Sequence, residues 1–322
     1  MTGGPLFVSS GDVTADQHYG SALQCAARGD LAGAAEILAQ TVQVAPAFAT
    51  AWFALGAIRD SLGDRAGVIT AWQAARDADP DDYHGARLQL ARLGVGENTP
   101  AMTAAYVRRL FDQQAASFDE ALLQRLDYRG PEVVLDAVRS VAGMELRIGS
   151  MLDLGCGTGL GGAAFRPYAD WLVGVDISPG MVAKAREKGF YDRLAVLDLQ
   201  HFLHAEVQSR AQYHLVVAAD VFVYVSDLVP ITAAAARVLT PDGLFAFTVE
   251  VQSGDGVVLQ QTLRYAHGAP HVRTAIADAG LNLVALNHVV ARKEKGVPVP
   301  SLVVVASNSG PERSVPAVES DP

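Results

Sequence analysis

Met151-Leu-Asp-Leu-Gly-Cys-Gly-Thr-Gly-Leu160 is the stretch that decides the fold of the second half of the chain. A short apolar run leads directly into three glycines, Gly155, Gly157 and Gly159, and a helical segment follows them. Glycine has no Cβ, so the backbone can turn tightly there and approach a ligand closely. The pattern predicts a strand, a ligand-binding turn and a helix, although a glycine-rich turn alone also suits nicotinamide and flavin folds.

Short apolar runs alternate with helical segments from Arg147 onward, which predicts a doubly wound α/β sheet. The expected strands are Met151–Leu154, Leu172–Val175, Leu194–Leu197, Leu215–Ala219, Leu244–Val249, Leu281–Val290 and Leu302–Ala306. Between the last two runs, Arg292-Lys-Glu-Lys295 is expected to be a solvated hairpin turn. A clamp for a phosphate or carboxylate group of a substrate is the alternative.

Four of the expected strands end on or next to a carboxylate: Asp153, Asp176, Asp198 and Asp220. The carboxyl ends of parallel strands border the crevice in which open α/β sheets bind ligands, so we expect all four to face it. Carboxylate oxygens at such a strand end suit the two hydroxyl donors of a ribose. Solvated loop aspartates are the alternative interpretation, and it carries most weight at Asp220.

The Gly-Cys-Gly-Thr-Gly loop at 155–159, with Asp153 two places before it, resembles the S-adenosylmethionine loop of class I methyltransferases. Its G-x-G-x-G spacing disfavours an NAD-dependent oxidoreductase. The resemblance covers roughly residues 105–308 and implies a Rossmann-like methyltransferase sheet with S-adenosylmethionine as cofactor. The cofactor-binding residues it implies are Asp153, Gly155, Gly157, Gly159, Asp176, Ile177, Met181, Asp198, Leu199 and Asp220. In the family, the position of Asp198 faces the adenine amino group.

Upstream, the segment 111–118 resembles the helix that covers the cofactor in small-molecule O-methyltransferases, where a Tyr-Asp pair is usual. This chain has Phe118-Asp119, so a contact from a tyrosine hydroxyl is not expected at that point.

Methyl transfer requires a nucleophile held in line behind the methyl group, and a base only where the acceptor is protonated. The residues considered for this base are His267, His271, Tyr224, Asp220 and Glu250. Of these, we predict His267, Tyr224 and Glu250 as catalytic residues, and a structural role is the alternative for His267. No metal site is predicted, because Gly268 and Pro270 disrupt the helical spacing of the nearby histidine pair. His201 and His204 are expected to be solvent-exposed.

The N-terminal part repeats itself at an offset of 34 residues: Gly29-Asp30 recurs as Gly63-Asp64, and Pro46 recurs as Pro80. Each Gly-Asp predicts a turn between two helices, and each proline follows the second helix of a pair. This resembles the tetratricopeptide repeat, with about two units and a capping helix near 83–93. An ordinary alanine-rich helical bundle is the alternative.

The chain has 322 residues, which suggests about two domains. Its 25 basic and 35 acidic residues give a net charge of −10, which argues against a nucleic-acid partner. Two cysteines cannot form a disulfide framework or a zinc site, and apolar runs stay below the roughly 18 residues of a membrane span, so we expect a soluble, cytoplasmic protein. The expected divisions are a disordered leader (1–12), a tetratricopeptide-repeat domain (13–98), a methyltransferase domain with its lid helices (101–308) and a disordered tail (309–322).

The chain as a whole is similar to a bacterial group of predicted methyltransferases that contain tetratricopeptide repeats, and Leu263-Arg-Tyr-Ala-His267 fits that group. The resemblance implies methyl transfer from S-adenosylmethionine to O or N of a small-molecule acceptor. Two alternatives remain at this point: a protein or carrier-bound acceptor docked by the repeats, and a non-catalytic scaffold that binds S-adenosylmethionine.

Overall fold

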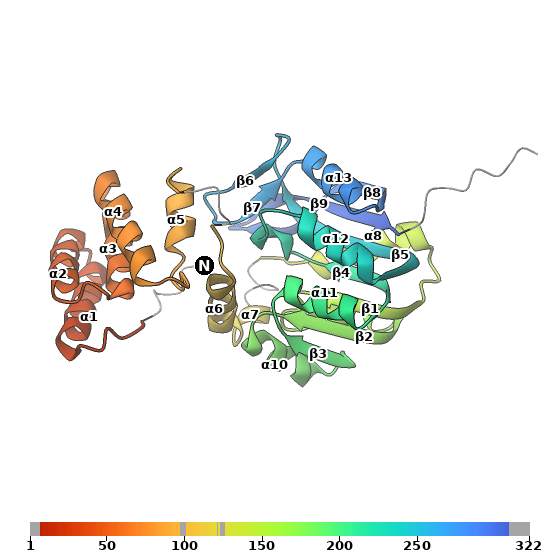
Figure 1. Ribbon diagram of the computed structural model, residues 1–322, viewed down its shortest axis with the longest axis horizontal. Helices are drawn as coiled ribbons and strands as arrows, with labels where there is room; N and C mark the ends of the chain where they lie inside the picture. Colours follow the sequence, from red (N-terminus) through yellow and green to blue (C-terminus); the bar gives the residue numbers. More distant parts are fainter. Residues whose placement is uncertain (1–6, 97–100, 121, 123–125, 309–322) are drawn as a thin grey trace, which may run out of the picture. The chain divides into compact units, whose positions relative to one another are not determined.

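The computed structural model describes residues 7–96, 101–120, 122 and 126–308, which form two compact units (Figure 1). The first comprises residues up to 113 together with Leu259–Arg264, and the second comprises 114–258 and the chain from 265 onward. Most of α6 (Ala104–Gln114) and the segment 259–264 belong to the helical unit, whereas the sequence pattern predicts both in the second domain. The expected tail, 309–322, lies outside the described residues.

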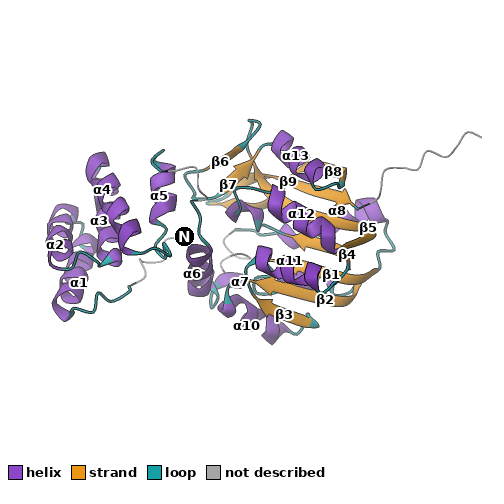
Figure 2. Cartoon of the chain, viewed as in Figure 1, coloured by secondary structure: helices purple, strands orange, loops and turns teal. Residues whose placement is uncertain are grey.

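The first unit is helical, as Figure 2 shows, apart from its loops and the short 259–264 segment. Besides α6, its helices are α1 (Val13–Ala27), α2 (Leu31–Val44), α3 (Ala49–Leu62), α4 (Arg65–Ala78) and α5 (Ala86–Arg92). The 34-residue offset is visible in the helix caps. Asp30 begins α2 by accepting from the Gly33 N–H at 2.9 Å, and Asp64 begins α4 by accepting from the Gly67 N–H at 2.9 Å. A carboxylate at this position satisfies a backbone donor that the helix leaves unpaired.

Close packing between α3 and α4 depends on Gly56. A Cβ at Gly56 would lie 2.2 Å from Nε1 of Trp72, a side chain that is only 1% exposed. The indole N–H of Trp72 donates to the Phe53 carbonyl at 3.2 Å, so the ring is held in place. The helical region is therefore confirmed, while its identity as a tetratricopeptide repeat stays a prediction.

The described end of the leader is ordered by contacts with this unit. The Phe7 ring lies 5.5 Å from that of Tyr19 and 6.3 Å from that of Phe48, measured between ring centroids. The Val8 N–H donates to Oγ1 of Thr50 at 3.2 Å, and that hydroxyl donates to the Val8 carbonyl at 3.0 Å. The expectation of a disordered leader does not hold for these residues, and residues 1–6 lie outside the described part.

The second unit is built on one mixed sheet (Figure 1). Its strands are β1 (Ile148–Leu154), β2 (Ala169–Asp176), β3 (Arg193–Val196), β4 (Tyr213–Ala218), β5 (Leu239–Val251), β6 (Val257–Leu259), β7 (Tyr265–His267), β8 (Asn282–Glu294) and β9 (Val297–Ser307). The order β3-β2-β1-β4-β5 is parallel, β9 pairs antiparallel with β5, and β8 pairs antiparallel with β9. The seven predicted strands are present, whereas the short β6 and β7 were not predicted.

Helices cover both faces of this sheet, because side chains alternate along each strand. Leu152 and Leu154 of β1 pack with residues of α11 (Leu199–Gln208), α12 (Val229–Val238) and α13 (Ala269–Asp278). Met151 faces the other way and packs with residues of α8 (Gly130–Ala142) and α9 (Leu160–Phe165). The unit thus has the Rossmann-like, doubly wound architecture that the alternating pattern predicts.

No helix within the described ranges is long and apolar enough to cross a membrane.

Candidate active site

The glycine loop joins β1 to α9 at the point where the strand order reverses. Gly155 has φ +70°, and a Cβ there would lie 2.6 Å from Cγ2 of Val221, in the segment after β4. The loop therefore packs directly against the end of β4. β1 lies between β2 and β4, and α/β sheets bind ligands in the crevice at such a reversal.

Gly157 presents the open side of this loop. Its φ is +52°, and in the described part of the chain the atom nearest to an added Cβ is Cε1 of Phe118, at 3.9 Å. The Gly157 N–H donates to Oδ2 of Asp176 at 2.9 Å, and the Ser178 N–H donates to Oδ1 at 2.8 Å. A carboxylate is also the kind of acceptor that a ribose hydroxyl needs. A half-buried glycine backbone beside a fixed carboxylate fits a cofactor that carries a ribose.

Other predicted cofactor residues follow β2. Ile177 is half-buried beside Asp176. Met181 is fully buried in α10 (Pro179–Lys188), and its N–H donates to Oγ of Ser178 at 3.0 Å. Ile177 thus keeps some exposed surface after β2, while Met181 is part of the interior of α10.

The predicted residues after β3 are placed differently. Asp198 is the N-cap of α11, where it accepts from the Gln200 N–H at 2.9 Å, and its side chain is 36% exposed. Leu199 packs against the core of the α11 face. His201 and His204 are exposed, as expected. The Asp198 carboxylate is thus already engaged in holding a helix end.

Asp153 does not share the surface of Asp176, because it points into the interior below the loop. It is 3% exposed and accepts from the Tyr191 hydroxyl at 2.6 Å, and that hydroxyl in turn accepts from the Gly162 N–H at 2.8 Å. Burial raises the pKa of Asp153 to about 7, an effect that the charge of Asp176 increases and the Tyr191 hydrogen bond opposes. Asp153 is therefore engaged with Tyr191, and its expected role toward the cofactor stays a prediction.

Tyr191 is a site-supporting residue that our sequence reasoning missed. It lies 38 residues from its partner Asp153, and no local pattern links the two. The two side chains meet only because the segment before β3 packs against β1 and α9 in the folded unit.

A buried ion cluster lies at the carboxyl ends of β4 and β5. Nη1 of Arg292 donates to Oδ1 of Asp220, and Nη2 donates to Oε1 of Glu250. Arg292 is 1% exposed and Glu250 is 3% exposed. The expectation of a solvated Arg292 is therefore wrong, since the residue belongs to β8 and the turn comprises Lys295 and Gly296. These two carboxylates, with that of Glu294 3.6 Å from Nε, supply the counter-charge without which a guanidinium is not buried.

Asp220 differs from Glu250 in that one of its oxygens remains accessible. Its side chain is 20% exposed, and its φ of +60° is unusual for a residue with a Cβ. The backbone N–H is held by Oγ1 of Thr248 at 2.8 Å. Arg292 engages Oδ1, and within the described ranges Oδ2 has no hydrogen-bond partner.

The other predicted catalytic residues lie deeper. His267 is fully buried, and its Nε2 donates to the Phe222 carbonyl at 3.2 Å. Burial lowers the pKa of His267 to about 4, so the ring is neutral at pH 7. Its ring stacks on that of His271, with centroids 5.5 Å apart. Tyr224 ends the short turn η2 (Phe222–Tyr224) and is half-buried.

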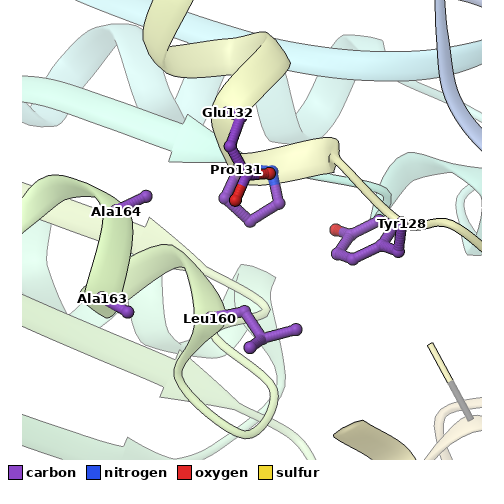
Figure 3. Close-up of a pocket in the computed structure, with 6 residues that line it drawn as sticks. All are labelled: Tyr128, Pro131, Glu132, Leu160, Ala163 and Ala164. Atoms are coloured by element: carbon purple, nitrogen blue, oxygen red, sulfur yellow. The ribbon is translucent and has the colours of Figure 1, made fainter. Parts of the chain in front are cut away.

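A small pocket adjoins the helix that follows the glycine loop (Figure 3). It encloses about 240 Å³ between α9 and the start of α8, and its lining residues are Tyr128, Pro131, Glu132, Leu160, Ala163 and Ala164. The Tyr128 hydroxyl donates to the Ala219 carbonyl at 3.4 Å, which links the pocket to the end of β4. Burial raises the pKa of Tyr128 well above its ordinary value, so the phenol remains a donor.

Within the described ranges, no three His, Cys, Asp or Glu side chains gather closely enough to hold a metal ion.

Residues 152–247 match the family described as a methyltransferase domain. The chain is 33% identical over 110 residues to methyltransferase-like protein 27 of Homo sapiens, an alignment that covers 34% of this chain and 44% of that protein. It is 29% identical over 94 residues to the ubiquinone biosynthesis O-methyltransferase of Rhodopseudomonas palustris, covering 29% of this chain and 37% of the relative. The chain thus spans less than half the length of the curated relatives it matches.

Among solved structures, the 1,6-didemethyltoxoflavin-N1-methyltransferase of Burkholderia thailandensis, with bound S-adenosylhomocysteine, has a TM-score of 0.50. It is 17% identical in sequence, and the match covers 67% of this chain and 92% of that one, so it shows a common fold. The glycine loop, the Asp176 carboxylate and the family match fall within the same 96 residues. Residues 152–247 therefore match a methyltransferase domain, within a fold shared with a methyltransferase that holds S-adenosylhomocysteine, and this supports S-adenosylmethionine as the cofactor.

Proposed function

We propose that the chain transfers a methyl group from S-adenosylmethionine to an oxygen or nitrogen of a small-molecule acceptor by in-line displacement. The bound cofactor supplies a methyl group already activated by its sulfonium. The observation that carries the proposal is the open backbone of Gly157, with Asp176 beside it and the pocket behind α9 close by. Holding the two reactants in line accounts for most of the acceleration in such a reaction.

We assign the acceptor contact to Asp220 in preference to the other candidates. Its Oδ2 can accept from the O–H or N–H of an acceptor while Arg292 fixes Oδ1. The acceptor lone pair forms the new bond to carbon, the carbon–sulfur electron pair stays on sulfur, and the acceptor proton passes to Oδ2 or to water. Glu250 and His267 are both enclosed, which suits them to a supporting role, and Tyr224 remains a further candidate.

The names of similar proteins support transfer to oxygen or nitrogen. The Rhodopseudomonas relative is an O-methyltransferase of ubiquinone biosynthesis, and the Burkholderia enzyme is an N1-methyltransferase bound to 1,6-didemethyltoxoflavin. Both names describe small-molecule acceptors.

Two measurements test the proposal in sequence. Isothermal titration of the folded chain with S-adenosylmethionine should give saturable binding, and its absence at millimolar ligand would contradict the cofactor assignment. Methyl-labelled S-adenosylmethionine incubated with small-molecule cell extract should then yield a labelled product. A labelled product also excludes a non-catalytic scaffold.

An acceptor presented by the helical unit is the second candidate function. The equivalent aspartate caps of α2 and α4 support a tetratricopeptide-repeat fold for residues 13–98, and such repeats form docking surfaces. The two cores of the sheet unit contain no residue before Val134, so removal of residues 1–98 leaves them intact. Unchanged turnover of a labelled acceptor after this deletion would rule out a docking role.

A further inference from the structure

Three residues from separate segments of the sheet unit meet beside the glycine loop. Asp119 of α7 (Phe118–Glu120) accepts from Oγ1 of Thr158 in the loop. Its Oδ2 also lies 2.6 Å from Nζ of Lys188, in the last turn of α10, and that ammonium lies 3.4 Å from Oγ1 of Thr158. We call Asp119, Thr158 and Lys188 the Asp119 clamp. It ties α7 to both the loop and α10, which lie next to it in Figure 1.

The clamp lies next to Phe118 in the chain. This residue directly precedes Asp119, and its Cε1 is the atom that lies 3.9 Å from an added Cβ on Gly157. One atom of the ring therefore lies at van der Waals distance from the side of Gly157 that fits the cofactor. Movement of Phe118 would therefore change the space beside this backbone.

The strength of the clamp suits reversible opening. The Asp119 side chain is 36% exposed and that of Lys188 is 27% exposed, so water screens part of their attraction. Thr158, in contrast, is 2% exposed and belongs to the fixed loop. When the clamp opens, the glycine loop with Thr158 therefore stays in place and α7 moves away from it.

We propose that the Asp119 clamp is a positioning device for cofactor exchange, which opens to admit S-adenosylmethionine and to release S-adenosylhomocysteine. In the closed state, Asp119 holds Phe118 over the loop and slows passage in both directions. The inference depends on the cofactor assignment and not on any acceptor. It can therefore fail while the proposed methyl transfer stands, and the reverse also holds.

The test measures association and dissociation rate constants of S-adenosylhomocysteine by surface plasmon resonance, with the full chain immobilised. Asp119→Ala and Lys188→Met each remove one side of the ion pair. Lys184→Met is the matched control, because Lys184 lies on the same helix and pairs with Glu187 of that helix at 2.9 Å. We expect both rate constants to rise about 10-fold in the two clamp variants, equal to about 1.4 kcal/mol of barrier, and to stay unchanged in the control.

A rise of the association rate constant distinguishes an Asp119 clamp that controls cofactor exchange from a contact that only stabilises the fold. Damage to the site would slow association and lower the melting temperature, and that result would overturn the proposal. Rate constants within two-fold of the Lys184→Met control in both clamp variants would overturn it as well. A charge exchange, Asp119→Lys with Lys188→Asp, should restore slow exchange, because the ion pair re-forms with opposite polarity.

Discussion

Replacing Arg292 by methionine should destabilise the sheet unit by about 3–5 kcal/mol at pH 7, the usual cost of leaving a buried charge unpaired. The guanidinium is 1% exposed and its partner Glu250 is 3% exposed, so little solvent is present to compensate the abandoned carboxylate. Methionine retains much of the side-chain volume, which keeps the cavity contribution small. The cost of leaving Asp220 without Arg292 should be smaller, because the Asp220 side chain is 20% exposed to water.

If the lost stability comes from the unpaired charge of Glu250, two further results are expected. Adding Glu250→Gln to Arg292→Met should recover about half of the lost stability, since the double variant buries no unpaired charge. The cost of Arg292→Met should also shrink between pH 7 and pH 5, because an unpaired buried carboxylate binds a proton more readily than one in the unfolded chain.

Urea unfolding, monitored by hydrogen exchange in peptides from β5 and β9, would measure this loss of stability in the sheet unit alone. The helical unit contributes no signal to those peptides, so a second transition does not confuse the result. A cost below about 1 kcal/mol at pH 7 would refute the reasoning. A double variant no more stable than Arg292→Met would refute it equally, because the loss would then come from packing.

Three other predictions follow from the two units. Because the pKa of Asp153 is about 7 in the folded chain against 3.8 ordinarily, the folded state keeps a proton that the unfolded state loses. Its contribution to stability therefore falls by about 1 kcal/mol per pH unit from pH 5 to 7, and urea titrations of Asp153→Asn should lack this slope. Gly56→Ala should lower the stability of the helical unit by about 1–3 kcal/mol through its clash with Trp72, as judged by thermal unfolding. In contrast, Gly20→Ala, in α1 with open space around it, should raise the stability slightly. Asp176→Ala should weaken S-adenosylmethionine binding by about 10- to 100-fold in calorimetry, whereas an unchanged affinity would remove Asp176 from the site.

Local patterns predicted the features that depend on neighbours in the chain. The run from Met151 to Leu160 contains its own strand, turn and helix start, and the glycines have the positive φ that such a turn needs. The Gly-Asp pairs likewise predicted turns between helices, and in the structure each aspartate caps the next helix through an N–H only three residues away. The alternation of apolar runs was sufficient for the order of elements and for the doubly wound architecture.

Side-chain roles at the strand ends depended instead on contacts across long separations. Asp153, Asp176 and Asp220 look alike in the sequence, yet one is buried under Tyr191, one holds the glycine loop and one is paired with Arg292. Arg292 lies 72 residues from Asp220 and 42 from Glu250, so its charged neighbourhood suggested a solvated turn. Periodicity assigns a residue to a strand end, but burial and the nearest opposite charge decide which atoms remain available to a ligand, and both arise only when the strands are assembled.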